Sequence, residues 1–219
     1  MNNHTPYKPS YNYLPPIGPH LLTPLYDTIC FLMGLGKSFK RQALSSVPIN
    51  DGETIADIGC ATGVFLELAK NKYRNSRIIG IDPDAKALAI AKKRLAYRGL
   101  DAELYEAFAE SLPLPNNSVD ICFSTLAFHH MPDDVKRKAL EEMMRILKPF
   151  GRIVIADFGP TKGYWLRRLL FFEKMEYLKG NLDGVIPQFI NELGFKELGV
   201  AGKKFPGIVI FTAKKGGTS

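Results

Sequence analysis

Short apolar runs alternate with longer amphipathic segments through the middle of this chain. The apolar β-type runs occupy residues 54–58, 77–81, 102–107, 119–124 and 152–158. Helical spacing of apolar residues is found at 64–70, 85–97 and 133–147, between those runs. Strands that alternate with helices of this length predict right-handed βαβ crossovers and a mainly parallel sheet with helices on both faces.

The two ends of the chain depart from this alternation. Helices are predicted at 23–33 and around Lys37 to Leu44 before the sheet, and at 165–178 and 187–193 after it. Two late strands, 196–200 and 207–213, have a short connection, which favours an antiparallel hairpin at one edge. We therefore expect an N-terminal arm and helical lid over 1–48. A Rossmann-like, doubly wound α/β domain with a seven-stranded sheet is expected over 49–215.

Composition narrows the class of protein without selecting a partner. Hydrophobic residues make up 46% of the 219 positions, and the apolar stretches are too short for a membrane span. The proline-rich N-terminus is unlike a signal peptide, so a cytoplasmic location is expected. Cys30, Cys60 and Cys122 lie far apart, which favours reduced thiols over a zinc site. The net charge of +7 allows nucleic acid, anionic lipid or an acidic substrate alike.

The segment from Asp57 to Gly63 (DIGCATG) lies between the first strand and the next helix. In a doubly wound sheet, ligands bind beyond the carboxyl ends of the strands, where the strand order reverses. Gly59 and Gly63 allow a sharp turn there. Asp82 ends the next strand, 23 positions beyond Gly59, where a carboxylate can accept hydrogen bonds from ribose hydroxyls. A nucleoside ligand is expected, but the GxGxxG order of dinucleotide enzymes is missing.

Four runs in order carry a family resemblance: DIGCATG, GIDPD, AESLPLPNNSVDICFSTLAFHH and ALEEMMRILKPFGRIVIAD. They resemble the class I S-adenosylmethionine-dependent methyltransferases, most closely the subgroup of ubiquinone and menaquinone C-methyltransferases. The resemblance covers roughly residues 53–157, about half of the chain. It implies S-adenosylmethionine as the cofactor and S-adenosylhomocysteine as its product.

The resemblance also implies a set of cofactor contacts. The methionine part of the cofactor is lined by Asp57, Gly59, Cys60 and Gly63, and the ribose is held by Asp82. The adenine is surrounded by Pro83, Phe108, Ala109 and Glu110. Ser124 lies at the strand end facing the sulfonium, and a lid contains Tyr26 and Asp27. Three positions depart from the family pattern. Ala61 replaces the middle glycine of the bend, Phe108 replaces an adenine-binding aspartate, and Phe150 replaces a glycine of a Pro-Gly-Gly turn. The first two predict weaker cofactor binding, with ring stacking by Phe108 in place of a hydrogen bond.

His129 and His130 are the candidate catalytic residues, because they follow the fourth strand near the expected acceptor. An imidazole there can remove a proton from a hydroxyl or a carbon acid. Equally, the segment can be a connection whose histidines are bound by the backbone. The 165–178 segment is also open to two interpretations. It is either a core-facing helix with a basic outer side or an element that roofs an apolar pocket or contacts an anionic membrane.

The resulting functional hypothesis is in-line transfer of a methyl group to a small, apolar or aromatic acceptor. Nucleic acid is disfavoured, because Ser124 to Ala127 lacks the Asn/Asp-Pro-Pro-Tyr segment of amine-methylating enzymes of bases. Cys122 also lacks the preceding proline of cytosine C5 enzymes. An RNA or protein methyltransferase and a non-catalytic binding module remain the alternatives. No metal is expected, and the sequence does not indicate an oligomeric state.

Overall fold

The computed structural model describes residues 34–161, 177–204 and 207–217. The predicted helix at 23–33, with Tyr26, Asp27 and Cys30, lies outside these residues, as does most of the predicted helix at 165–178. The strands are β1 (Thr54–Ile58), β2 (Arg77–Asp82), β3 (Glu103–Glu106), β4 (Val119–Thr125), β5 (Leu147–Phe158), β6 (Lys196–Lys204) and β7 (Ile208–Lys214).

The helices alternate with the strands as far as β3, which is followed directly by β4. They are α2 (Lys37–Leu44), α3 (Val64–Lys72), α4 (Ala85–Tyr97), α5 (Asp133–Ile146), α7 (Leu178–Asp183) and α8 (Val185–Glu192), with a short 3₁₀ turn, η2, at Phe128–His130. Across the described residues, no helix combines the length and the apolarity that crossing a bilayer demands.

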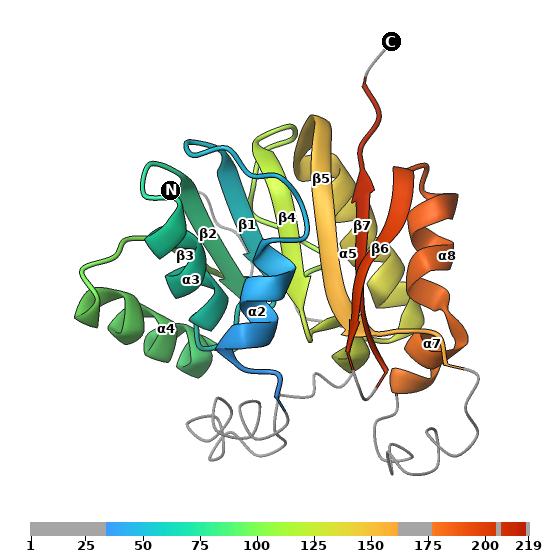
Figure 1. Cartoon of the computed structure of the whole chain (residues 1–219), viewed down its shortest axis with the longest axis horizontal. Coiled ribbons are helices and arrows are strands. Elements are labelled where there is room, and N and C mark those ends of the chain that lie inside the picture. Colours follow the sequence, from blue (N-terminus) through green and yellow to red (C-terminus); the bar gives the residue numbers. More distant parts are fainter. Residues whose placement is uncertain (1–33, 162–176, 205–206, 218–219) are drawn as a thin grey trace, which may run out of the picture.

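The seven strands form one sheet in the order β3-β2-β1-β4-β5-β7-β6 (Figure 1). The pairs from β3 to β5 are parallel, whereas β7 runs antiparallel to β5 and β6 antiparallel to β7. The predicted fold class and its antiparallel edge are therefore confirmed. The chain leaves β1 toward β2 on one side and reaches β4 on the other, so the strand order reverses between β1 and β4.

Helices cover both faces of the sheet (Figure 1). Helices α2, α3 and α4 contribute apolar residues to one core cluster, on what we call the α2 face. Helices α5 and α8 contribute to the other cluster, on the α5 face. Each cluster is built from the inward sides of the helices and one side of the strands, as expected for a three-layer α/β fold.

Alternation along each strand assigns its polar residues to one of these faces. In β1, Ile55 packs in the α2-face cluster and Ala56 in the α5-face cluster, so Asp57 is on the α2 face. In β2, Ile78 and Ile79 divide in the same way, which places Asp82 on the α2 face as well. The two carboxylates at the ends of adjacent strands thus share one face.

The same rule separates two other polar groups. In β4, Phe123 belongs to the α2-face cluster, so Thr125 is on the α2 face and Ser124 is on the other. In β5, Ile155 belongs to the α5-face cluster, so Asp157 is on the α5 face. Two groups of polar side chains therefore collect near the carboxyl ends of the central strands, one on each face.

Predicted boundaries hold best where capping signals are strong. Helix α4 spans the predicted residues because the Asp84 side chain accepts the N–H groups of Lys86 and Ala87 at 2.9 and 3.3 Å. Strand β5 begins at Leu147 rather than at Arg152, because Leu147 already pairs with Val119 before an irregularity in the ladder. Strand β6 continues beyond the predicted 196–200, and helix α7 was not predicted.

Phe150 lies in the early part of β5 with φ of +62° and 72% of its surface exposed. A left-handed backbone is unfavourable for a residue with a Cβ, and Phe150 occupies the position where the family pattern has glycine. The ring has little burial with which to offset that strain.

We expect Phe150→Gly to raise the free energy of unfolding by about 1 kcal/mol, by removing the steric penalty of the left-handed conformation. Urea denaturation with an unchanged m-value is the measurement. Phe150→Ala is the matched control, because it removes the ring but keeps the Cβ. An equal gain from alanine would show that the exposed ring, not the backbone, is responsible.

Candidate cofactor site

The bend after β1 requires glycine at two positions. Gly59 and Gly63 adopt φ of +78° and +76°. A Cβ added to Gly59 would lie 2.5 Å from the Cβ of Ala127, and one added to Gly63 would lie 2.7 Å from the Cβ of Ala91. The bend therefore packs closely against the segment after β4 and against α4. A larger residue at either glycine would displace the bend from these neighbours.

Asp82 fastens this bend to the end of β2. Its Oδ2 accepts the N–H of Ala61 at 2.8 Å, and its Oδ1 accepts the N–H of Asp84 at 2.9 Å. Burial raises the pKa of Asp82 to about 6, although these two N–H groups oppose the shift. Asp82 thus has a structural role that was not predicted, and the predicted ribose contact remains a prediction.

Ala61 is the residue that replaces the middle glycine of the bend. It adopts φ of +47°, so the backbone keeps a left-handed conformation although the residue carries a Cβ. Its N–H bond to Asp82 is one interaction that offsets the strain. The predicted effect of Ala61 on cofactor affinity is not tested by this geometry.

Asp57 is completely buried on the α2 face, one residue before the end of β1. Neither carboxylate oxygen has a hydrogen-bond partner among the described residues. Burial raises the pKa of Asp57 to about 7; Lys40 lowers it and Asp82 raises it further. A buried carboxylate without partners is costly, and such groups in native structures call for a functional explanation.

Lys40 is a site residue that the sequence analysis did not single out. It lies on α2, only 4% exposed, and its Nζ donates to Thr125 Oγ1 at 3.2 Å. Its neighbours on the helix, Phe39 and Ala43, are core residues. A lysine between buried positions of an amphipathic helix was the available signal, because such a position faces the protein interior.

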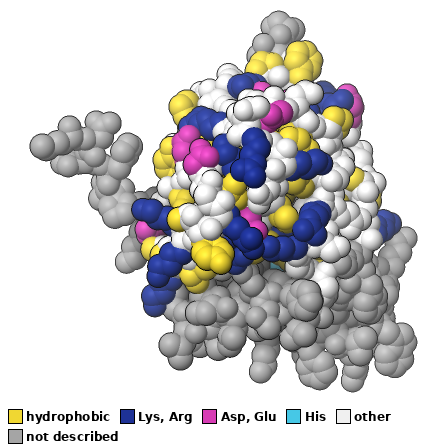
Figure 2. Space-filling model, turned by 60° about the vertical axis from the view of Figure 1, so that its left-hand side comes forward, with side chains coloured by type: hydrophobic (Ala, Val, Ile, Leu, Met, Phe, Trp, Pro, Cys, Tyr) yellow, Lys and Arg dark blue, Asp and Glu magenta, His cyan; other side chains and the backbone are white. Residues whose placement is uncertain are grey.

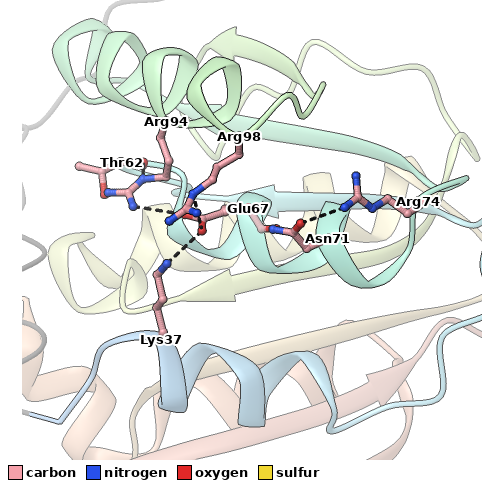
Figure 3. A network of polar contacts seen from close by, with 7 residues as sticks. All are labelled: Lys37, Thr62, Glu67, Asn71, Arg74, Arg94 and Arg98. Atoms are coloured by element: carbon pink, nitrogen blue, oxygen red, sulfur yellow. Dashed lines mark hydrogen bonds and ion pairs between the residues drawn. The ribbon is translucent and has the colours of Figure 1, made fainter.

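A polar network holds α2 against the bend (Figure 3). Glu67, in the first turn of α3, contacts Lys37 of α2 at 2.9 Å and Arg94 of α4 at 3.4 Å. Arg94 Nε also donates to the carbonyl oxygen of Thr62 in the bend at 2.8 Å. Burial would raise the pKa of Glu67, but Lys37 and Arg94 outweigh it and hold the pKa below its usual value. One carboxylate therefore links three helices around the site.

The predicted adenine contacts lie beside Asp82. Pro83 follows it directly, and Phe108 to Glu110 follow β3, which pairs with β2 through Asp82 and Glu106. The N–H of Ala107 donates to the main-chain oxygen of Asp82 at 3.3 Å. The structure thus brings these residues to one side of the bend, as the resemblance implies, while their contact with adenine remains a prediction.

Cys60 and Ser124 direct their side chains into the fold. The Cys60 thiol is buried in the α2-face cluster, and burial raises its pKa. Ser124 Oγ donates to the carbonyl oxygen of Ile58 at 2.8 Å and thereby joins β4 to β1.

A histidine and an aspartate meet on the α5 face. His129 Nδ1 lies 2.9 Å from Asp157 Oδ1, and the carboxylate also accepts the N–H groups of Phe128 and Phe158. Burial alone would raise the pKa of Asp157, but His129 and the Phe158 N–H outweigh it and hold the pKa below its usual value. Asp157 was not predicted as a site residue, although an acid at the end of a parallel strand was a usable signal.

The two neighbouring histidines are not equivalent. Burial and the adjacent His129 lower the pKa of His130 to about 3, against a smaller opposing effect of Asp157. His130 is therefore neutral and a weak base at neutral pH. The ring centroids of the two histidines lie 4.0 Å apart, and only His129 contacts the carboxylate.

A groove on the outer side of α2 and α3 shares Lys37 and Glu67 with the polar network. Its lining includes Lys37, Arg41 and Lys72 together with Glu67. Figure 2 shows basic side chains interspersed with acidic and apolar ones over the visible described surface. The net positive charge is thus visible as scattered basic groups rather than as a single-sign surface.

The sequence profile described as "Methyltransferase domain" matches residues 55–151, which contain the bend, Asp82 and His129. The demethylmenaquinone methyltransferase of Thermus thermophilus is 29% identical over 168 residues, covering 74% of this chain and 76% of the relative. That of Desulfitobacterium hafniense is 34% identical over 169 residues, covering 72% and 64%. The matched profile and these relatives support a class I S-adenosylmethionine-dependent methyltransferase domain in this chain.

Solved structures agree on the fold. A methyltransferase from Aquifex aeolicus has a TM-score of 0.63 at 20% identity, covering 80% of this chain and 88% of that chain. A structure described as the [4+2]-cyclase SpnF has a TM-score of 0.71 at 16% identity, covering 90% and 93%. At these identities the likeness shows the fold alone. The chain spans less than two thirds of the length of the Desulfitobacterium relative.

The residues present fit the cofactor of the family. S-adenosylmethionine combines a nucleoside with a zwitterionic amino acid, whose ammonium group complements a buried carboxylate without partners such as Asp57. Two glycines keep Cβ atoms away from the bend, and Asp82 stands at the end of the neighbouring strand. Both ends of the cofactor therefore have matching groups on the α2 face.

The raised pKa of Asp57 predicts opposite pH effects on stability and on binding. The folded-state value of about 7 exceeds the ordinary 3.8, so the ionised carboxyl costs stability. This cost is absent below about pH 4 and complete above about pH 7. We expect Asp57→Asn to raise the unfolding free energy at pH 7.5 or above and to weaken binding of S-adenosylhomocysteine.

Calorimetric titrations with S-adenosylhomocysteine test the binding half. Wild-type affinity should fall as the pH drops from about 7.5 to 5.5, because protonated Asp57 cannot pair with an ammonium group. Asp57→Asn should leave only the weaker dependence of Asp82, centred near pH 6. Burial raises the pKa of the neighbouring Cys60 thiol, so this group stays protonated over the same range. A pH profile unchanged in the variant would contradict the assignment.

Proposed function

We propose that this protein transfers a methyl group from S-adenosylmethionine to a small, apolar or aromatic acceptor by in-line displacement. The observation that carries the proposal is the pair of buried carboxylates, Asp57 and Asp82, on the same face beside the glycine bend. The names of the relatives add the acceptor class, because demethylmenaquinone is a small, apolar molecule whose quinone ring is fused to an aromatic ring.

The protein's part in such a reaction is alignment. Bound at this site, S-adenosylmethionine would supply a methyl group on a positively charged sulfur, which is a good leaving group. Asp57 and Asp82 hold the two ends of the cofactor, and the glycine bend allows the backbone to lie against it. Fixing both ends lowers the entropy cost of reaching the in-line geometry, which is the largest contribution that a protein can make here.

His129 and Asp157 are suited to remove the acceptor's proton. Asp157 is ionised at neutral pH, so it accepts a hydrogen bond from the Nδ1–H of His129 and leaves Nε2 as the basic nitrogen. An acceptor hydroxyl or ring carbon would give its proton to Nε2 as the new bond to the methyl group forms. His129 is 7% exposed, which limits water at this nitrogen.

Fold similarity alone does not decide the reaction, since a neighbour in structure is named as a cyclase. The alternatives are an RNA or protein methyltransferase and a non-catalytic binding module. A binding module would keep the cofactor contacts without methyl transfer. An RNA enzyme would bind its substrate through basic surface groups with a steep salt dependence.

Incubation of the protein with methyl-labelled S-adenosylmethionine and a cell extract tests the proposal. The labelled product should appear in the organic-soluble small-molecule fraction, and a reduced short-chain demethylmenaquinone serves as a defined probe. Label in RNA or protein would support the alternative enzymes. Cofactor binding by calorimetry without any labelled product would support the binding module.

The histidine pair provides a mutational test of the proton transfer. His129→Gln should lower turnover by about 100-fold or more, the usual loss when a general base is removed. Binding of S-adenosylhomocysteine should stay unchanged, because His129 lies on the opposite face from Asp57. His130→Gln, the matched control, should retain most of the turnover, because the lowered pKa of His130 makes it a weak base.

The pH profile separates a base from a merely structural residue. If His129 is the base, a pH dependence of turnover that is present in the wild type and in His130→Gln should be absent in His129→Gln. Equal losses of turnover from both histidine variants, with the pH dependence retained in each, would remove His129 from the mechanism.

A further inference from the structure

Lys40 is a buried lysine that forms no ion pair within hydrogen-bond distance among the described residues. Only 4% of the residue is exposed, and its one hydrogen-bond partner among the described residues is the neutral hydroxyl of Thr125. Burying an ammonium group is expensive unless it is paired with a charge and fully hydrogen-bonded. The Thr125 hydroxyl meets one of three N–H donors.

Asp57 is the complementary case on the same face. Its two oxygens have no hydrogen-bond partner among the described residues, so Lys40 and Asp57 influence each other's charge without forming a hydrogen-bonded pair. Two opposite charges that could have joined are thus kept apart. A ligand that carries both signs of charge close together would satisfy both of them.

The position of Lys40 is fixed from outside the site. Lys37, one helical turn earlier, contacts Glu67 of α3 at 2.9 Å, and Glu67 is tied through Arg94 to the bend (Figure 3). Residues three apart lie on the same side of a helix, so this contact holds the side of α2 that carries Lys40 against the sheet. The lysine is therefore preorganised rather than mobile on a surface.

We propose that Lys40 is a cofactor-binding residue that holds the α-carboxylate of the methionine moiety while Asp57 holds its α-ammonium group. This inference rests on the proposed function, because it adds a residue to the same site. In it, the ligand's carboxylate becomes the charged partner that Thr125 cannot provide. Lys40 and Asp57 together then select a zwitterionic amino-acid end over a neutral or singly charged one.

The competing interpretation is that Lys40 only offsets the negative charge of Asp57 and Asp82. In that case its loss would weaken every ligand of the site to a similar degree. The proposed role is specific to one chemical group of the ligand, so changing the ligand separates the two interpretations.

Three ligands measured by calorimetry provide the test. S-adenosylhomocysteine carries both charged groups, its decarboxylated analogue keeps only the ammonium, and 5′-methylthioadenosine lacks the amino-acid part. Lys40→Met should weaken binding of S-adenosylhomocysteine about 10- to 100-fold, as expected for a lost charge-assisted contact. Binding of the other two ligands should change by less than about threefold.

Arg41→Met is the matched control. It removes the same charge from the next residue of α2, at an exposed position. It should leave all three affinities unchanged within about twofold, because an exposed charge is screened by water and salt. If Lys40→Met does not fold, Lys40→Gln is the substitute, because it keeps a polar group of similar length. A further measurement uses the wild-type protein alone: its affinity for S-adenosylhomocysteine is compared with its affinity for the decarboxylated analogue.

The outcomes are distinguishable from failure of the proposed function. If the wild-type protein binds none of the three ligands, the cofactor site itself is refuted. If it binds S-adenosylhomocysteine and its decarboxylated analogue equally well, the role of Lys40 is overturned while the site stands. An equal loss of all three ligands in Lys40→Met would favour the charge-offsetting interpretation and also overturn the proposal.

Discussion

The bond between the Asp82 carboxylate and the N–H of Ala61 closes the glycine bend against the end of β2. Because the second oxygen of Asp82 accepts the N–H of Asp84, the same side chain also fixes the start of α4. The bend, the neighbouring strand end and the following helix therefore move as one unit. This unit can form only because glycine at positions 59 and 63 lets the backbone approach its neighbours closely.

The site is built at the expense of stability. Asp57 is buried without a hydrogen-bond partner among the described residues, Lys40 has a neutral one, and Ala61 keeps a left-handed backbone. Each of these features is unfavourable in the free protein, and each lies on the α2 face near the strand order reversal. Their concentration in one place is what preorganisation for a charged ligand requires, since the binding partner then supplies the missing contacts.

Function is divided between the two faces of the sheet. The groups that match the cofactor lie on the α2 face, while His129 and Asp157 meet on the α5 face. Similarity to the methyltransferase relatives accounts for the first group, whereas the proposed removal of a proton from the acceptor would depend on the second. A common fold shared with enzymes of other names is consistent with this division, because cofactor binding and acceptor chemistry can change independently.

Local patterns in the sequence determined the strands, the glycine bend and the cap of α4, because turn geometry, side-chain alternation and capping depend on near neighbours. The shared face of Asp57 and Asp82 became clear only when this alternation was combined with the observed core clusters. Only the tertiary structure showed that Lys40 is buried on the α2 face and that Asp157 pairs with His129. Those contacts join residues far apart in the chain. Helix packing and strand order bring the residues together, and neither can be inferred from their spacing in the sequence.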